Sequence, residues 1–377
     1  MKDVRSLFRI PDDVAYLNHA YMAPELRSVA AAAQWGLDRK AQPWTFTVED
    51  FFEPAERVRR KVATVFGSST DDIALAASVS YGIETAVINT PLSVGDNIVL
   101  LDEQFPSNVY PWREAAQRVG ACVRMVPRSD DQTDAILGQI DDNTAAVSVA
   151  AIHWTDGQTI DLVRLREAAR AVNALLVLDL TQSLGVMPFD LARIDPDFAV
   201  AAGYKWLLCP YATAYLYVAP RHQDGRPLEH GWITRDGAAR FSELVHYREG
   251  FAAGARRFDM GERSNFITLP MSEAALDQLL AWGIEPLYAH LSEVNQGIAA
   301  RAQSLGVTAR PLEERAGHYL GLTLRSGDPN AVAERLKADK IFVSVRGRSI
   351  RVTPHMYTTP ADIDRFFEVL ETSLGGE

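Results

Sequence analysis

Lys205 and Asp179 are the residues whose types and spacing most clearly predict a chemistry. Asp179 lies at the end of a short apolar run, Gln182 follows three positions later, and Lys205 lies 26 positions (205 − 179) after the acid. A lysine amine forms a Schiff base with an aldehyde, and a carboxylate keeps a pyridine nitrogen protonated so that the ring can withdraw electrons. A nearby amide is suited to hydrogen-bond a ring hydroxyl. These residue types predict a site for pyridoxal 5′-phosphate (PLP).

The elements expected to position these residues alternate between short apolar strands and amphipathic helices. Helices are expected between several strands, for example at 107–119 and 162–172. This alternation is typical of a mostly parallel sheet covered on both faces, and ligands bind such sheets at the carboxyl ends of strands, where Asp179 falls. The expected strands are 73–77, 97–101, 122–126, 145–152, 175–180, 198–201 and 213–218.

The rest of the chain predicts a second, smaller unit. At 377 residues the chain is longer than one hydrophobic core usually serves. We predict a large α/β domain at 16–255 and a small α+β domain formed by 1–15 and 256–377. The other expected features are a turn-rich excursion at 219–227, a helix at 271–305 bent near Gly283 and Pro286, strands at 319–324, 341–345 and 350–353, and a closing helix at 360–370.

Composition excludes several classes of protein. The formal net charge of −11 argues against nucleic acid as a partner, because phosphate binding requires a basic face. The two cysteines, Cys122 and Cys209, are too few for a disulfide framework or a metal cluster, and no metal site is predicted. No apolar run approaches the roughly 20 residues that span a bilayer, and the amino-terminal residues do not read as a signal peptide. We therefore expect a cytoplasmic enzyme that does not bind membranes.

Several motifs, in order along nearly the whole chain, resemble the class V aminotransferase superfamily, which includes cysteine desulfurases, kynureninases and isopenicillin N epimerase-like proteins. They are the opening segment at 16–20, the Asp179–Gln182 stretch with 195–198 and 203–205, and the closing segment at 349–364. The resemblance implies PLP fold type I, in which a large domain with a seven-stranded, mainly parallel sheet is joined to a small α+β carboxyl-terminal domain. It also implies an α-amino acid substrate that reacts through an external aldimine.

The resemblance assigns further residues to the cofactor. Ser78, Val79 and Ser80 match the phosphate-binding turn, where helix-terminal N–H groups and a hydroxyl suit a dianion. Phe105 matches the residue that stacks on the cofactor ring, and Tyr204, just before the lysine, is similar to the kynureninase arrangement. The remaining matches are Thr155 and Asp156, which fall where the family has a residue near the ring hydroxyl, commonly asparagine. Asp156 departs from that pattern. A carboxylate that faced the ring oxygen would have to be protonated, or it must point elsewhere.

Substrate-binding residues are implied in the same way. Arg351 matches the arginine that holds the substrate α-carboxylate, which a guanidinium grips with two parallel hydrogen bonds. Asn18 and His19 belong to the opening segment, and Trp232 resembles a kynureninase-like substrate wall, although a loop tryptophan is about as often part of a core. Arg346 and Arg348 are interpreted as solvated charges at a strand edge.

The segment before the long helix predicts a homodimer with shared active sites. Residues 256–265 resemble the segment that reaches the cofactor phosphate of the neighbouring subunit. The family usually has threonine at the position of Glu262, and glutamate is a poor phosphate ligand. Ser264 or Asn265 would have to make the contact instead, or it is lost.

The absence of one particular cysteine limits the reactions that the chain is expected to catalyse. Cysteine desulfurases carry a persulfide-forming cysteine on a loop before the carboxylate-binding arginine, and residues 343–351 contain none. A lyase that performs β-elimination or cleaves a C–S or C–C bond is the leading prediction, with aminotransferase and epimerase as alternatives. Ala202, Asp156 and Glu262 also leave open a PLP-binding protein without turnover. A nucleotide-binding protein is disfavoured, because no glycine-rich phosphate loop follows a strand.

Overall fold

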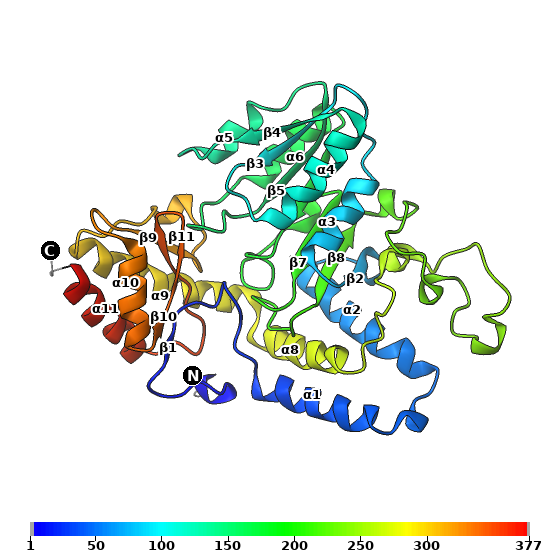
Figure 1. The fold of residues 1–377 in the computed structure, drawn as a ribbon, viewed down its shortest axis with the longest axis horizontal. Helices are drawn as coiled ribbons and strands as arrows, with labels where there is room; N and C mark the ends of the chain where they lie inside the picture. Colours follow the sequence, from blue (N-terminus) through cyan, green and yellow to red (C-terminus); the bar gives the residue numbers. More distant parts are fainter. Residues whose placement is uncertain (1–3, 375–377) are drawn as a thin grey trace.

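A seven-stranded sheet forms the centre of the larger part of the molecule (Figure 1). The computed structural model describes residues 4–374. The strand order is β2-β8-β7-β6-β5-β3-β4, and only β8 runs antiparallel to its neighbours β7 and β2. The strands are β2 (Ile73–Ala76), β3 (Asn97–Leu101), β4 (Cys122–Val126), β5 (Thr144–Ala150), β6 (Leu175–Asp179), β7 (Phe198–Ala202) and β8 (Ala214–Val218). The predicted sheet, seven-stranded and mainly parallel, is confirmed.

Alternate residues of the central strands are buried in two separate hydrophobic layers. In β6, Leu176 and Leu178 belong to one layer and Val177 to the other, as the two-residue period of a strand requires. Helices α3 and α4 cover the layer that contains Val177, while α2, α6 and α8 cover the opposite one. The helices are α1 (Arg27–Lys40), α2 (Glu53–Phe66), α3 (Val79–Ile88), α4 (Tyr110–Val119), α5 (Gln132–Leu137), α6 (Leu162–Ala171), α7 (Leu191–Ile194), α8 (Thr268–Trp282), α9 (Ile284–Ser304), α10 (Pro329–Ala338) and α11 (Pro360–Leu374).

The long helix predicted at 271–305 is two helices. Gly283 separates α8 from α9 and has a φ of 78°, a conformation that glycine adopts without steric cost. After β8, residues 219–267 contain only short 3₁₀ turns, and Figure 1 shows part of this excursion extending away from the sheet. The predicted excursion is therefore present, but it extends to residue 267, well beyond the predicted range of 219–227.

The small α+β unit contains two further sheets. Strands β11 (Ser344–Arg346), β12 (Ser349–Val352) and β9 (Leu320–Thr323) form an antiparallel sheet, and β1 (Ala15–Tyr16) pairs with β10 (Ile341–Phe342). The single strand predicted at 341–345 is thus split between the two sheets. The predicted domain division stays a proposal; because α8 packs against α1 and α2, we propose moving residues 268–282 to the large domain.

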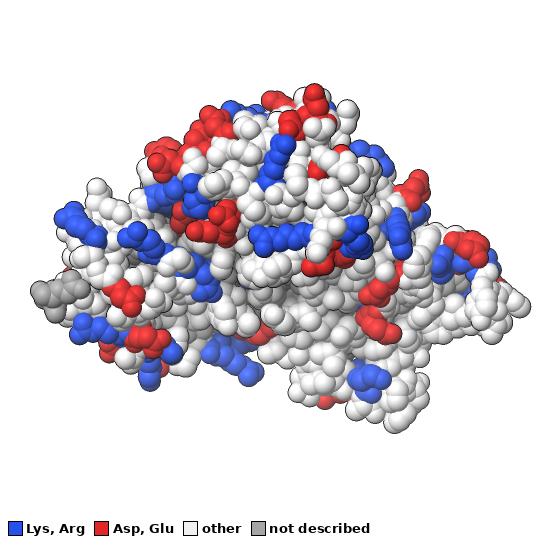
Figure 2. Space-filling view, turned by 45° about the horizontal axis from the view of Figure 1, so that its top comes forward, with Lys and Arg blue, Asp and Glu red and all other residues white. Residues whose placement is uncertain are grey.

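Charged side chains of both signs are interspersed over the face shown in Figure 2, where lysine and arginine form no single continuous patch. In residues 4–374, no helix is both long and apolar enough to cross a bilayer. The same residues contain no cluster of three or more histidine, cysteine, aspartate or glutamate side chains arranged to hold a metal ion. The cytoplasmic location stays a prediction.

Candidate active site

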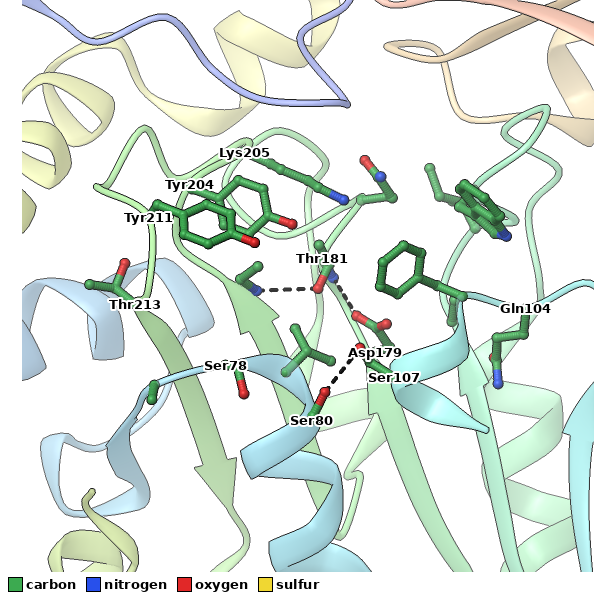
Figure 3. A pocket seen from close by; sticks show the side chains of 18 of the residues that line it. Ser78, Ser80, Gln104, Ser107, Asp179, Thr181, Tyr204, Lys205, Tyr211 and Thr213 are labelled. Carbon is green, nitrogen blue, oxygen red and sulfur yellow. Dashed lines mark hydrogen bonds between the residues drawn. The ribbon is translucent and has the colours of Figure 1, made fainter. Parts of the chain in front are cut away.

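The carboxyl ends of five parallel strands meet at one edge of the sheet and surround a cavity of about 440 Å³. Asp179 is the last residue of β6, and Lys205 lies three residues after the end of β7. Ser78 follows β2, Phe105 follows β3, and the segment at 152–154 follows β5. Figure 3 shows Lys205 and Asp179 reaching into the same space from these loops. The sheet thus brings together residues that are far apart in the sequence.

Asp179 is buried at the floor of the cavity, with only 5% of its surface exposed. Its Oδ1 accepts a hydrogen bond from the backbone N–H of Thr181 at 3.0 Å. Burial raises the pKa of the Asp179 carboxyl, while the hydrogen bonds from Thr181 and the charge of Lys205 act in the opposite direction. A buried carboxylate of this kind is stabilised by any cationic N–H that faces it.

Lys205 is 6% exposed and its amine lies beside aromatic rings. Its Nζ is 5.4 Å from the centre of the Phe105 ring and 5.5 Å from that of Tyr204. Within residues 4–374, no carboxylate lies within ion-pair distance of Nζ. Burial, followed by the positive charge of Arg351, lowers the pKa of Lys205 to about 8, while Asp179 raises it and Arg346 lowers it further. The amine is therefore neutral, and nucleophilic, at a lower pH than an exposed lysine.

The amino terminus of α3 points toward the other end of the cavity. Ser78 caps this helix by accepting a hydrogen bond from the N–H of Tyr81 at 3.1 Å, and Ser80 donates one to Ser107 at 3.0 Å. Ser78, Val79 and Ser80 all line the cavity, as Figure 3 shows for the two serines. Unpaired helix-terminal N–H groups and hydroxyls are suited to a phosphate.

Ala202, Gly203 and Thr213 form the wall between the helix terminus and Lys205. Gly203 is required by close packing, because a Cβ there would lie 2.2 Å from Oγ1 of Thr213. Thr213 lines the cavity, and its hydroxyl donates to the carbonyl of Pro210 at 2.7 Å. Thr213, which no motif of the sequence predicted, therefore places a hydroxyl oxygen on this wall that can accept a hydrogen bond.

Gln182 lines the cavity but both ends of its amide are already engaged. Its Nε2 donates to the carbonyl of Ala20 at 3.1 Å, and its Oε1 accepts from the indole N–H of Trp206 at 3.0 Å. These bonds fix the orientation of the amide and leave one N–H for a further acceptor. Of the opening segment, Asn18 and His19 are buried and do not line this cavity. His19 stacks on His355 with ring centres 4.1 Å apart.

The segment after β5 presents different residues to the cavity from those predicted. His153 and Trp154 line it, whereas Thr155 and Asp156 do not. The hydroxyl of Thr155 pairs with Nδ1 of His153 at 2.7 Å. The Asp156 carboxylate accepts from Arg128 at 2.6 Å and from Arg310 at 3.0 Å, so it points away from the cavity into an ion-pair network.

Arg351 lies beside a smaller cavity, of about 160 Å³, that adjoins the first at Lys205. Arg351 as a whole residue is 1% exposed. Its Nη1 donates to the carbonyl of Trp154 at 3.2 Å and to the hydroxyl of Tyr319 at 3.1 Å. The structure also places Arg346 and Tyr21 on this cavity. Arg346, which was interpreted from its sequence position as a solvated charge, thus lies on this cavity, and no motif of the sequence predicted Tyr21 there.

Three of the predicted residues lie elsewhere in the single chain. Trp232 packs in an aromatic cluster with Phe51, Phe52 and Phe241 and does not line either of these two cavities. The Ser264 hydroxyl donates to the carbonyl of Phe51 at 2.5 Å, and Asn265 accepts from the N–H of Thr268 at 2.9 Å at the start of α8. Their proposed contact with a neighbouring subunit stays a prediction.

Comparison with known proteins defines the family. The Aminotransferase class-V family model matches residues 45–366. A kynureninase from Deinococcus radiodurans is 30% identical over 72% of this chain and 67% of its own. A cysteine desulfurase from Thermococcus onnurineus NA1 superposes with a TM-score of 0.86 at 18% identity, over 100% of this chain and 98% of that one. C-DES, a cystine C–S lyase solved with glycine covalently linked to its PLP cofactor, gives 0.87 at 19% identity, over 99% of each chain.

The protein belongs to the class-V aminotransferase family, and it is a PLP-dependent enzyme of fold type I. The residues present fit the cofactor. The large cavity has an unpaired lysine amine of lowered pKa, a buried carboxylate, and a helix amino terminus with hydroxyls at the opposite end. We propose that Lys205 would hold the cofactor aldehyde, that Asp179 would hold a proton at the pyridine nitrogen, and that Ser78 with the first N–H groups of α3 would hold the phosphate.

The lowered pKa of Lys205 gives a pH prediction. Only the neutral amine attacks an aldehyde, so the rate at which PLP recombines with the apoprotein should rise with pH up to about 8 and then level off. With an ordinary lysine the rate would keep rising up to a pH of about 10.4. Stopped-flow absorbance between pH 6 and pH 10 measures this; a rate still climbing tenfold per pH unit above 9 would contradict the lowered pKa.

Proposed function

We propose that this enzyme is a lyase that acts on an α-amino acid, by β-elimination or by cleavage of a C–S or C–C bond, without a persulfide cysteine. The observation that carries the proposal is the position of Arg351 across a small cavity from Lys205, with no carboxylate of its own to neutralise it in residues 4–374. A free guanidinium beside a reactive amine is suited to hold the α-carboxylate of an amino acid with its Cα near that amine.

The chain's residues have separate tasks in such a reaction. When bound, PLP supplies an electron sink for the electrons left at Cα. Arg351 binds and orients the substrate carboxylate, and the Lys205 amine is placed to take the proton from Cα. Asp179 would hold a proton at the pyridine nitrogen, and the Phe105 and Trp154 rings, with centres 5.5 Å apart, line both cavities.

The lyase reaction is favoured over sulfur transfer through a persulfide by the state of the cysteines. No cysteine lines either cavity at Lys205. Cys209 is buried, and burial raises the pKa of its thiol to about 12, so it is not a nucleophile at neutral pH. Cys122 lies in β4 as predicted but is exposed, not buried, because β4 is an edge strand. The kynureninase among the similar proteins supports the same reaction class.

A variant that combines Cys122→Ser and Cys209→Ser should keep its turnover within about threefold, because neither thiol reaches the cavity. Steady-state rates measured with any active amino acid, compared with thermal melting of the same protein, test this. Inactivation of a folded double variant that retains its bound PLP would support a desulfurase reaction instead of the proposed lyase reaction.

The proposed function itself is tested with a panel of amino acids, each assayed with and without a 2-oxo acid. A lyase should release ammonia, pyruvate, sulfide or another cleavage product without the oxo acid. Product formation only when the oxo acid is present would show that the enzyme is an aminotransferase and not a lyase. Inversion at Cα without a cleavage product would replace it by an epimerase, and no reaction with any amino acid would favour a PLP-binding protein without turnover.

We also propose that the enzyme is a homodimer with shared active sites. Large apolar side chains are exposed on α1, on the loop that follows it and on the excursion at 219–267. The lower right of Figure 2, where these segments lie, is largely white. On these segments the most exposed large apolar residues are Trp35, Leu37, Trp44, Val245 and Tyr247. Exposed apolar surface of this kind is typical of interaction sites, and a two-fold interface would repeat any contact between residues 261–265 and the partner's cofactor.

Light scattering should therefore give twice the chain mass, and dilution to monomers should release PLP. Ser264→Ala or Asn265→Ala should speed that release. Because Asn265 also caps α8 in its own chain, its change should cost about 1 kcal/mol of stability, and thermal melting separates this loss from cofactor release. A monomer that retains PLP tightly would refute the shared site.

A further inference from the structure

Two arginines share the small cavity at Lys205, although an α-carboxylate needs only one. Arg346 lies in β11 and Arg351 in β12, which are paired strands of the small unit. Both side chains line the cavity with Lys205, Trp154 and Tyr21. Two guanidinium groups and the Lys205 amine therefore face one small space. Among the described residues that line the two cavities, Asp179, in the larger one, is the one carboxylate.

Neither arginine is neutralised within its own chain. In the described part of the chain, no aspartate or glutamate lies within ion-pair distance of Arg346 or Arg351. Arg346 donates from Nη1 only to the carbonyl of Val345 at 2.7 Å, and its guanidinium lies 5.4 Å from the centre of the Trp154 ring. The Nε atoms of both arginines are buried without a hydrogen-bond partner. Buried guanidinium N–H groups without acceptors are costly and are stabilised when an anion binds.

The two arginines also repel each other. Burial, followed by the charge of Arg351, lowers the pKa of Arg346. The cofactor phosphate does not relieve this repulsion, because the helix terminus that suits it, at Ser78, belongs to the large cavity and not to the small one. The described part of the chain supplies no compensating anion, so the substrate is the source that we consider, and one carboxylate on Arg351 would leave Arg346 without a partner.

We propose that Arg346 binds a second anionic group on the substrate side chain, so that the enzyme acts on an α-amino acid with a second carboxylate. This inference rests on the proposed function for its choice of an amino-acid ligand. Arg351 holds the α-carboxylate next to Lys205, and Arg346, on the neighbouring strand and against the Trp154 ring, holds the carboxylate at the far end of the side chain. Tyr21, the residue after the opening segment, lines the same cavity.

Calorimetric titration of the holoenzyme with succinate and butyrate tests this site without any turnover. The two acids have the same carbon chain, and only succinate has a second carboxylate. Succinate should bind at least about tenfold more tightly than butyrate. Arg346→Gln should remove most of that difference and leave butyrate binding within about threefold. Arg346→Lys should restore part of it, because it retains the charge but not the planar fork.

Arg348→Gln is the matched control, because Arg348 is exposed in the same hairpin and lines neither cavity. This change should leave succinate binding within about twofold. Equal affinity of the wild-type enzyme for succinate and butyrate would overturn the second site whatever the variants do, and so would unchanged succinate binding in Arg346→Gln. A succinate preference that depends on Arg346, in a protein that cleaves no amino acid, would support the site and refute the lyase function.

Discussion

Replacing Lys205 by alanine should abolish the visible absorption of the bound cofactor and all turnover. Lys205 is the amine that lines both cavities, so it is placed both to hold the PLP aldehyde and to take the substrate proton. Loss of a positioned general base alone costs roughly 10²–10⁴-fold in rate, and loss of the covalent link adds to this. Borohydride reduction followed by peptide mass spectrometry should find the cofactor on the Lys205 peptide of the wild-type enzyme and nowhere in the Lys205→Ala protein.

Lys337→Ala is the control for this experiment, because Lys337 is exposed on α10 and lines neither cavity. It should keep both colour and rate within the error of measurement. A borohydride-stable adduct of the same yield in the Lys205→Ala protein would show that another amine holds the cofactor.

The sheet and its order of elements could be predicted from the sequence because most of its strands are buried on both faces. Each such strand is a short apolar run, and β3 and β4 begin and end at the predicted residues. The position of Asp179 and Lys205 at one cavity was predictable for a related reason, since residues that end or follow parallel strands lie at the ligand edge of the sheet. Family resemblance named Ser78, Val79 and Ser80, which line the same cavity. The chemical roles of these residues stay predictions.

The direction of loop side chains could not be predicted. Asp156 turns away from the cavity because Arg128 and Arg310, 28 and 154 residues distant, hold its carboxylate. No local signal in the sequence gives that pairing. Arg346 was misinterpreted for a similar reason. The alternation of side chains along a strand assigns Arg346 to one face of its sheet. Only the packing of the small unit against the large one shows that this face of the sheet borders Lys205.

Replacing Asp179 by asparagine should leave PLP bound but slow the exchange of the substrate α-hydrogen with solvent by roughly two orders of magnitude or more, about 3 kcal/mol of barrier. The amide keeps the size of the side chain and can still accept the hydrogen bond from Thr181, so the fold and the cavity should persist. It cannot carry the negative charge that holds a proton at the pyridine nitrogen, and the electron sink is weakened. Proton NMR of the substrate in deuterium oxide measures the exchange rate directly.

Asp142→Asn provides the matched control, because the same change is made at an exposed aspartate between α5 and β5. It should exchange the α-hydrogen at the wild-type rate. The buried position of Asp179 makes the comparison informative. Burial raises the pKa of its carboxyl, so a cationic N–H that faces the carboxylate stabilises its charged form, and an effect confined to the Asp179 variant is the result expected if that N–H is the pyridine nitrogen. Wild-type exchange in a folded, PLP-loaded Asp179→Asn protein would show that the ring nitrogen is not the group that Asp179 serves.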